Sequence, residues 1–297
     1  MRLSFASKTA ITCHDEGQHT SSIPLEVRVQ SATSTTVSKY SAIYSGQKAS
    51  CSAGLAPSPP FEERQSTQHQ IMTAKSPVVL ILGAGPNIGQ AVARTFASKG
   101  YKEADSTDNQ LNIPSDFCKT DDVVNAFAKV KKVFGIPSVV VYNVSAGNFT
   151  PADDPFALSF ADFSRDTTVN IHSAFVAAQQ AISGFAQLPA SAARTFIYTG
   201  NVLNVAILPR FLAAGVGKSG AAHMIWAASA AYKDRGYKFY YADERKADGS
   251  PKYRIDGDAH ANLYWELAHA KTQGPWMQTF VQGVGYKKFD TIYTPLA

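Results

Sequence analysis

Three glycines in the chain have the spacing of a phosphate-binding loop. Gly83, Gly85 and Gly89 follow an apolar run at 78–82 and open a segment with apolar residues at helical spacing. One glycine permits a tight turn and another lets the backbone approach a phosphate, while the helix N-terminus offers free N–H groups and a positive potential. Glycine triplets also occur in purely structural turns, but the strand before this one and the helix after it favour dinucleotide binding.

The elements around this loop alternate between strands and helices. Continuous apolar runs that end in turn residues predict buried strands at 78–82, 138–143, 194–200, 237–243 and 277–283. Apolar residues at helical spacing predict helices at 88–99, 123–134, 171–185, 211–233 and 257–270. This alternation predicts an α/β fold with a doubly wound parallel sheet, in a single domain over residues 76–290.

The composition excludes several classes of protein. With 297 residues, of which 45% are hydrophobic, the chain is long enough to bury a full core. Its net charge of +5 is too small to indicate nucleic-acid binding. The sequence has no apolar run of the roughly 18 residues that a membrane span needs. Cys13, Cys51 and Cys118 are too scattered for a zinc-binding pattern, so no metal is expected.

Residues 1–71 differ in composition from the rest of the chain. They are rich in Ser, Thr and Gln and end in a proline-rich stretch, and the predicted domain begins shortly after Met72. We therefore expect this segment to be disordered, or to be a spurious extension ahead of a start at Met72. A third interpretation is a mitochondrial presequence, because Arg2 and Lys8 precede any acidic residue, although two acidic residues follow soon after.

The glycine segment resembles that of the short-chain dehydrogenase/reductase family, and the resemblance extends over about residues 76–290. The family pattern is T-G-x-x-x-G-[IL]-G, and this sequence reads LGAGPNIG. Gly83 matches the first glycine, Ile88 the aliphatic residue and Gly89 the last glycine. Asn87 stands where the middle glycine is usual. The resemblance implies a Rossmann-type sheet.

Three further motifs resemble the family in the same order along the chain. IPSDF is similar to the strand end whose Asp contacts the adenine, which implies cofactor contacts for Asp116 and Phe117. VVVYNVSAG resembles the N-N-A-G strand end, with Asn143 in place. TTVNIHSAF is similar to the helix that carries the family's structural and catalytic asparagine, here Asn170.

The catalytic residues of the family are only partly present. The family has a Tyr and a Lys four residues apart on one helix, and a Ser at the end of the preceding strand. The Tyr is the general acid and the Lys holds the nicotinamide ribose. Lys218 matches the Lys, but Ala214 stands in the Tyr position and Gly200 in the Ser position. Either another polar side chain donates the proton, or Lys218 is an ordinary residue on a solvated helix face. The candidates for that donor are Tyr198, Thr199, Asn201 and Ser219.

Two cofactor-binding features of the family also differ here. No apolar run precedes Leu111 where the second strand is expected, and the simplest interpretation is that a segment of about one strand is missing. The adenosine pocket would then be open. Asp105 has the spacing of a ribose-binding acid, but with no strand to hold it we interpret it as a loop residue. The charged stretch 242–260, where the family often has a mobile substrate lid, carries Glu244-Arg245 in place of Pro-Gly.

The resemblance implies an NAD(P)-dependent oxidoreductase that acts on a small carbonyl or alcohol, with NADP slightly favoured over NAD. It implies a homo-oligomer in the cytoplasm, or in mitochondria if the N-terminal segment is a presequence, and no nucleic-acid or membrane partner. The implied catalytic residues are Lys218, Asn170 and Thr199. The implied cofactor-binding residues are Gly83, Gly85, Asn87, Ile88, Gly89, Asp116, Phe117, Asn143 and Lys218. Two alternatives stay open because the Tyr and the Ser are absent: a nucleotide-binding protein without redox turnover, and a non-redox reaction such as an isomerisation.

Overall fold

A single twisted sheet forms the centre of the protein. The computed structural model describes residues 25–31, 77–99 and 110–290, and for residues 25–31 it describes the backbone alone. The eight strands follow the order β3-β1-β2-β4-β5-β6-β7-β8 across the sheet. Their bounds are β1 Leu25–Ser31, β2 Val78–Leu82, β3 Gln110–Ser115, β4 Val139–Tyr142, β5 Thr195–Thr199, β6 Lys238–Arg245, β7 Met277–Val281 and β8 Gly285–Tyr286.

Most of the sheet is parallel, as the sequence predicts. Strands β2, β4, β5, β6 and β7 pair in parallel. Strand β1 is antiparallel to both β2 and β3, so β3 runs in the same direction as β2. The short strand β8 closes the other edge in antiparallel pairing with β7. The carboxyl ends of six strands therefore lie along one edge of the sheet, where α/β proteins bind their ligands.

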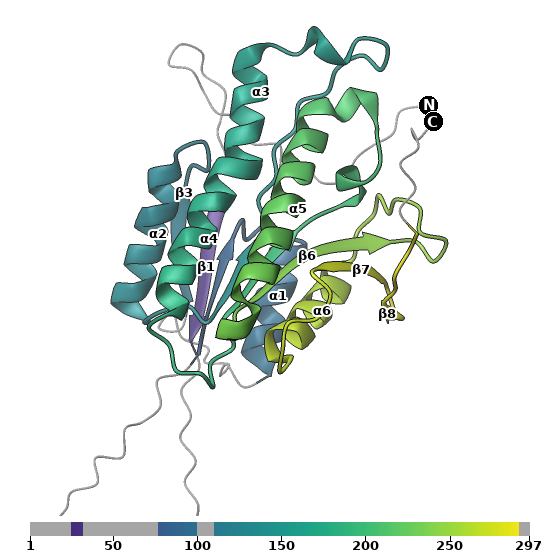
Figure 1. Ribbon diagram of the computed structural model, residues 1–297. Helices are drawn as coiled ribbons and strands as arrows, with labels where there is room; N and C mark the ends of the chain where they lie inside the picture. The colour runs from purple at the N-terminus through teal and green to yellow at the C-terminus, as the bar shows by residue number, and fades with distance from the viewer. Residues whose placement is uncertain (1–24, 32–76, 100–109, 291–297) are drawn as a thin grey trace, which may run out of the picture.

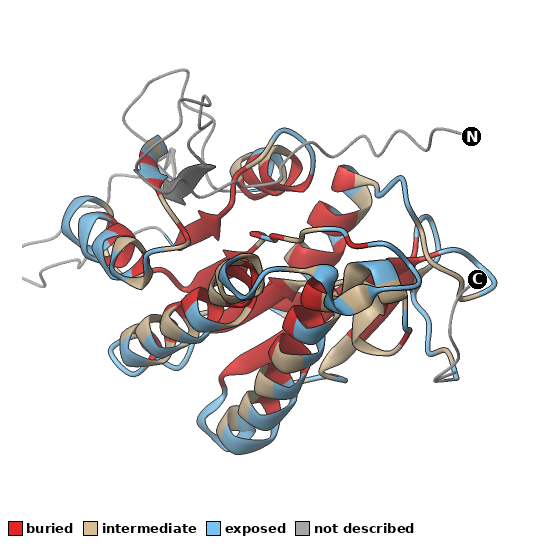
Figure 2. Cartoon of the chain, turned by 90° about the horizontal axis from the view of Figure 1, so that it is seen from above, coloured by how far each residue is buried: buried red, intermediate tan, exposed pale blue. Residues whose placement is uncertain are grey.

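Helices cover both faces of the sheet (Figure 1). Helices α1 (Ile88–Ser98) and α6 (Gly257–His269) pack on one face, around a core that includes Val79, Ile81 and Phe96. The other face carries α2 (Thr120–Val133), α4 (Ser173–Phe185) and α5 (Leu212–Tyr232). Strands β2, β4 and β5 in the centre of the sheet are almost entirely buried (Figure 2), which explains their continuous apolar sequences. Helix α3 (Phe160–Thr167) leads into α4 through a π-helical turn at Thr168–His172.

Strand β1 corrects the prediction for part of the N-terminal segment. The sequence predicts disorder over residues 1–71, whereas residues 25–31 form a strand of the sheet, second from one edge and purple in Figure 1. They lie between β2 and β3, the place of the strand that the sequence predicts to be missing. Strand β1 runs in the opposite direction to both neighbours. All five residues of β2 are buried, and a buried apolar strand needs a hydrogen-bonding partner on each side. The other residues of the 1–71 segment, and Asp105, lie outside the described residues.

Strand β6 continues farther than the sequence predicts. The predicted strand ends at residue 243, but pairing with β7 extends to Arg245. Asp243, Glu244 and Arg245 are all less than 9% exposed, so the start of the charged 242–260 stretch is buried strand and not solvated loop. Within the described ranges, no helix is both long and apolar enough to cross a membrane.

Candidate active site

A cavity of about 530 Å³ opens at the carboxyl ends of the parallel strands. Its walls come from four places in the chain that the fold brings together. These are the glycine loop after β2, the end of β4, the end of β5 with the turn that follows, and the end of β6 with the segment that leads to α6. Lys218 of α5 also lines the cavity. Its volume lies in the range of small-molecule sites.

The glycine loop forms one wall and leaves space for a ligand. Gly83, Gly85, Asn87 and Ile88 line the cavity. A Cβ atom added at Gly85 would meet no atom within 4 Å, so that side of the loop is open. Gly89 instead packs behind the loop, where an added Cβ would lie 2.5 Å from Ala84 Cα. The loop thus has the open backbone and the helix N-terminus that a phosphate requires.

Asn143 fixes the glycine loop to the neighbouring strand. Its Nδ2 donates to the Gly83 carbonyl oxygen at 2.8 Å, and Asn143 also lines the cavity. The structure places the two other implied cofactor residues, Asp116 and Phe117, after β3 and outside the cavity lining. Asp116 Oδ1 accepts from the Cys118 N–H at 3.0 Å, and Phe117 is fully buried.

Lys218 is a buried cation at the cavity wall. Its ammonium donates to the Thr199 carbonyl oxygen at 3.1 Å and to the Tyr198 hydroxyl at 3.4 Å, and it lies 4.8 Å from the Tyr198 ring centroid. Only 2% of the residue is exposed. Burial lowers the pKa of Lys218 to about 7, and the nearby Asp243 carboxylate opposes that shift. Lys218 is therefore not an ordinary residue on a solvated helix face.

The two other implied catalytic residues have different surroundings. Thr199 lines the cavity, and its hydroxyl lies 2.8 Å from that of Tyr264, a hydrogen-bonding distance. Asn170 lies behind the cavity in the π-helical turn, with no exposed surface. Its side chain donates to the Ala146 carbonyl at 2.7 Å and accepts from the Ala146 N–H at 3.2 Å, which holds the chain after β4.

The positions that lack the family's Tyr and Ser are closed by packing. Ala214 is buried close to the chain after β4. A Cβ atom added at Gly147 would lie 3.2 Å from the Cβ of Ala214. A Cβ at Gly200 would lie 2.1 Å from the Tyr241 ring. The Tyr241 hydroxyl donates to the Asn201 carbonyl at 2.9 Å, so the ring is held in that place. A serine at position 200 is therefore incompatible with the present position of Tyr241.

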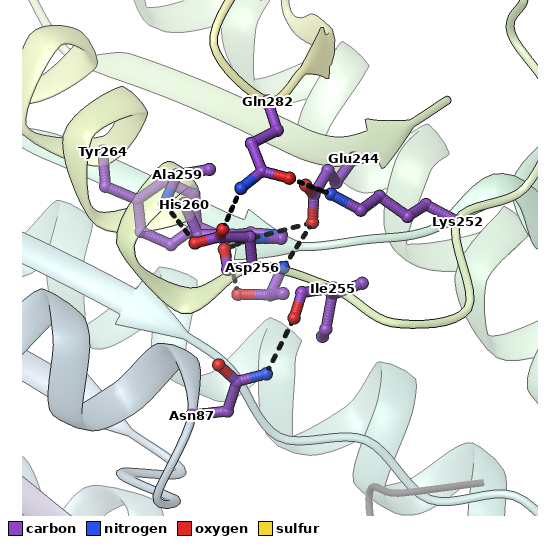
Figure 3. A network of polar contacts seen from close by, with 10 residues as sticks. Asn87, Glu244, Lys252, Ile255, Asp256, Ala259, His260, Tyr264 and Gln282 are labelled. Carbon is purple, nitrogen blue, oxygen red and sulfur yellow. Dashed lines mark hydrogen bonds and ion pairs between the residues drawn. The ribbon is translucent and has the colours of Figure 1, made fainter. Parts of the chain in front are cut away.

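A polar network joins the end of β6 to the start of α6 (Figure 3). Glu244 is 4% exposed, and its carboxylate accepts from Lys252 Nζ at 2.5 Å and from the Asp256 N–H at 2.7 Å. Lys252 also donates to Gln282 Oε1 at 2.7 Å, and Gln282 Nε2 donates back to the Asp256 carboxylate. His260 Nδ1 lies 2.7 Å from the Asp256 carbonyl oxygen, and burial lowers the pKa of this histidine.

The same segment is tied to the glycine loop. Asn87 Nδ2 donates to the Ile255 carbonyl oxygen at 3.2 Å (Figure 3). The residue in the middle-glycine position therefore connects the loop to the segment between β6 and α6. Pro251, Lys252, Tyr253 and Ile255 of that segment line the cavity.

Sequence reasoning missed the buried carboxylates of β6. Asp243 and Glu244 both line the cavity, on opposite faces of the strand. Their neighbours Tyr241 and Tyr240 lie in the cores on those two faces. The sequence predicts Asp243 as the last residue of the strand at 237–243 and gives it no functional role, and it predicts Glu244 in a charged loop.

These residues suit a dinucleotide better than a metal. The open side of Gly85, the helix N-terminus beside it and the Lys218 ammonium provide hydrogen-bond donors for phosphate and ribose oxygens. Across the described ranges, no three His, Cys, Asp or Glu side chains gather in a way that could hold a metal ion.

Comparison with known proteins identifies the family of the chain. No family model matches the chain. The short chain dehydrogenase/reductase dmxR12 of Cryptosporiopsis sp. (strain 8999) is 45% identical over 234 residues, which cover 72% of this chain and 95% of that protein. The chain therefore belongs to the short-chain dehydrogenase/reductase family.

Solved structures show the same fold at low sequence identity. A short chain dehydrogenase from Bacillus anthracis str. 'Ames Ancestor' has a TM-score of 0.56 at 15% identity, over 69% of this chain and 95% of that one. A metagenomic short-chain oxidoreductase in complex with NADP has a TM-score of 0.55 at 16% identity, over 68% and 96%. BdcA in complex with NADPH has a TM-score of 0.51 at 18% identity, over 71% and 95%.

Proposed function

We propose that the protein is an NADP-dependent oxidoreductase that interconverts a small carbonyl compound and its alcohol. The observation that carries the proposal is the shared cavity, in which the open glycine loop and the Lys218 ammonium face one space. The preference for NADP rests on the two similar structures that contain NADP and NADPH.

The chain's own residues would hold the two halves of the cofactor. The loop backbone around Gly85 and the N-terminus of α1 bind the pyrophosphate, and Lys218 donates to the nicotinamide ribose hydroxyls. When bound, the reduced cofactor supplies a hydride. A cavity of about 530 Å³ that also holds the nicotinamide end leaves space for a small substrate only. The segment around Tyr253 and Ile255 covers that space.

Cofactor titration tests this proposal. We expect the wild-type protein to enhance and shift NADPH fluorescence on binding, and NADH to bind more weakly. Gly85→Asp should abolish binding, because it sets a negative charge against the phosphates without meeting protein atoms. The matched control is Gly215→Asp, at another glycine whose added Cβ meets no protein atom, whose φ is not positive and which is not part of the cavity lining.

Turnover on a panel of small ketones and aldehydes tests the second half of the proposal. Reduction of at least one compound with NADPH is expected. Binding without any turnover would instead favour a nucleotide-binding protein without redox activity, and a folded protein that binds neither cofactor would refute the proposal.

A further inference from the structure

Asp243 is a buried carboxylate with one oxygen left over. It lies near the end of β6, is 1% exposed and lines the cavity. Its Oδ2 accepts from Arg245 Nε at 2.6 Å and from Arg245 Nη2 at 2.5 Å. Its Oδ1 has no hydrogen-bond partner among the described residues. A buried carboxylate oxygen is rarely left unpaired, so this one indicates the place of a ligand's donor.

Lys218 is the second cation near the Asp243 carboxylate, after Arg245. Both residues line the cavity, and each affects the pKa of the other. An ammonium has three N–H groups, and the protein contacts of Lys218 are Thr199 O and the Tyr198 hydroxyl. One N–H therefore remains for a ligand oxygen. A hydroxyl group between the two residues could accept from Lys218 and donate to Asp243.

The nearby hydroxyl groups are already engaged. The Tyr198 hydroxyl donates to the Asn170 carbonyl at 3.2 Å, and burial raises the pKa of Tyr198. The Thr199 hydroxyl pairs with that of Tyr264, whose pKa burial also raises. Ala214, in the position of the family's tyrosine, has no hydroxyl group that could donate a proton. Among these described groups, the carboxyl of Asp243 is the one that has a buried oxygen without a protein partner, so it is the group left to exchange a proton with a ligand.

We propose that Asp243 is the general acid and base of this site, in place of the family's tyrosine, and that Lys218 holds the nicotinamide ribose beside it. This inference rests on the proposed function. When bound, the reduced cofactor would supply the hydride to the carbonyl carbon, and Asp243 would give its proton to the carbonyl oxygen. The alcohol, the oxidised cofactor and the Asp243 carboxylate would result, and the carboxylate would regain a proton from water. In the reverse direction the Asp243 carboxylate would take the hydroxyl proton while the oxidised cofactor received the hydride.

The surroundings of Asp243 suit this exchange. Burial raises its pKa to about 6, against the opposing effects of the Arg245 guanidinium and the Lys218 ammonium. Glu244, the other charged neighbour on β6, raises it further, and Tyr241 is a neutral neighbour whose own pKa is raised. Reduction needs the protonated form, so kcat for reduction should fall as the pH rises above about 6. Oxidation needs the carboxylate, so kcat for oxidation should rise through the same range.

Substitution of Asp243 tests the inference with NADPH and the carbonyl of the panel that is reduced fastest. Asp243→Asn keeps an acceptor for Arg245 and removes the exchangeable proton. We expect kcat to fall 10²–10⁴-fold, the range of general acid–base catalysis. The Kd for NADPH should change less than threefold. The control Asp258→Asn, at a side chain 77% exposed in a surface pair with Arg94, should keep wild-type turnover.

Asp243→Glu gives a second variant. It keeps an exchangeable carboxyl proton on the same strand position, so it should retain at least tenfold more kcat than Asp243→Asn. The wild-type pH profile is a measurement that does not depend on the folding of any variant.

A readout without cofactor or substrate completes the test. The ¹³C-carboxyl resonance of Asp243, assigned by its loss in Asp243→Asn, should titrate with a midpoint near 6 in the cofactor-free protein. A midpoint below about 4.5, or an Asp243→Asn variant with kcat within threefold of wild type, overturns the inference while leaving the proposed function intact. A wild-type protein that binds no cofactor, or reduces no carbonyl, overturns both.

Discussion

A chain that begins at Met72 should fail to fold stably, because it lacks β1. Strand β1 pairs with β2 over five residue pairs and with β3 over six. An antiparallel ladder has about one hydrogen bond per residue pair, and each contributes about 0.5–1.5 kcal/mol net. Removal of both ladders therefore costs at least about 5 kcal/mol. A whole domain has about 5–15 kcal/mol of stability, so this loss is close to the total.

Three proteins compared by thermal and urea unfolding test this prediction: the full chain, a chain that begins at Ile23 and a chain that begins at Met72. The chain from Ile23 keeps β1 and should melt with the full chain. The chain from Met72 should be insoluble, or should melt more than 10 °C lower. A full-length Val27→Pro variant gives an independent measure, because Val27 lies opposite both Leu82 and Ile113 and a proline there removes a ladder donor. If the chain from Met72 melts within about 2 °C of the full chain, β1 contributes nothing and the reasoning is refuted.

Three smaller changes probe the site. Gly200→Ala should lower the free energy of unfolding by about 1–3 kcal/mol in urea denaturation, because the added methyl group would collide with the Tyr241 ring; an unchanged midpoint would show that the ring moves aside freely. Asn87→Gly removes the hydrogen bond to the Ile255 carbonyl, so stopped-flow measurement should show faster NADPH release with little loss of stability; equal release rates would mean that this bond does not restrain the segment. Lys218 is charged below its pKa of about 7, so NADPH affinity should weaken about 10–100-fold as the pH rises from 6 to 8.5. Lys218→Met should bind NADPH weakly at every pH. If the variant keeps the pH dependence, another group causes that dependence.

The sequence by itself determined the five parallel strands β2, β4, β5, β6 and β7 and the helices α1, α2, α4, α5 and α6. Residues 78–82 form a continuous apolar run because β2 is buried on both faces, and that signal is local. The glycine positions are likewise visible in sequence, because the tight turn and the close approach at Gly89 exclude other side chains. The position of Lys218 relative to Ala214 also followed from spacing along one helix.

Tertiary structure alone decided how the sheet is completed and where the buried charges lie. A short segment such as 25–31 has a weak pattern, and its place depends on pairing with β2, about fifty residues farther along the chain. Burial of Asp243 and Glu244 is not evident from the sequence, because charged side chains are rarely buried without partners. Their partners Arg245 and Lys252 compensate that cost only once the chain has folded, and no local pattern records such an arrangement.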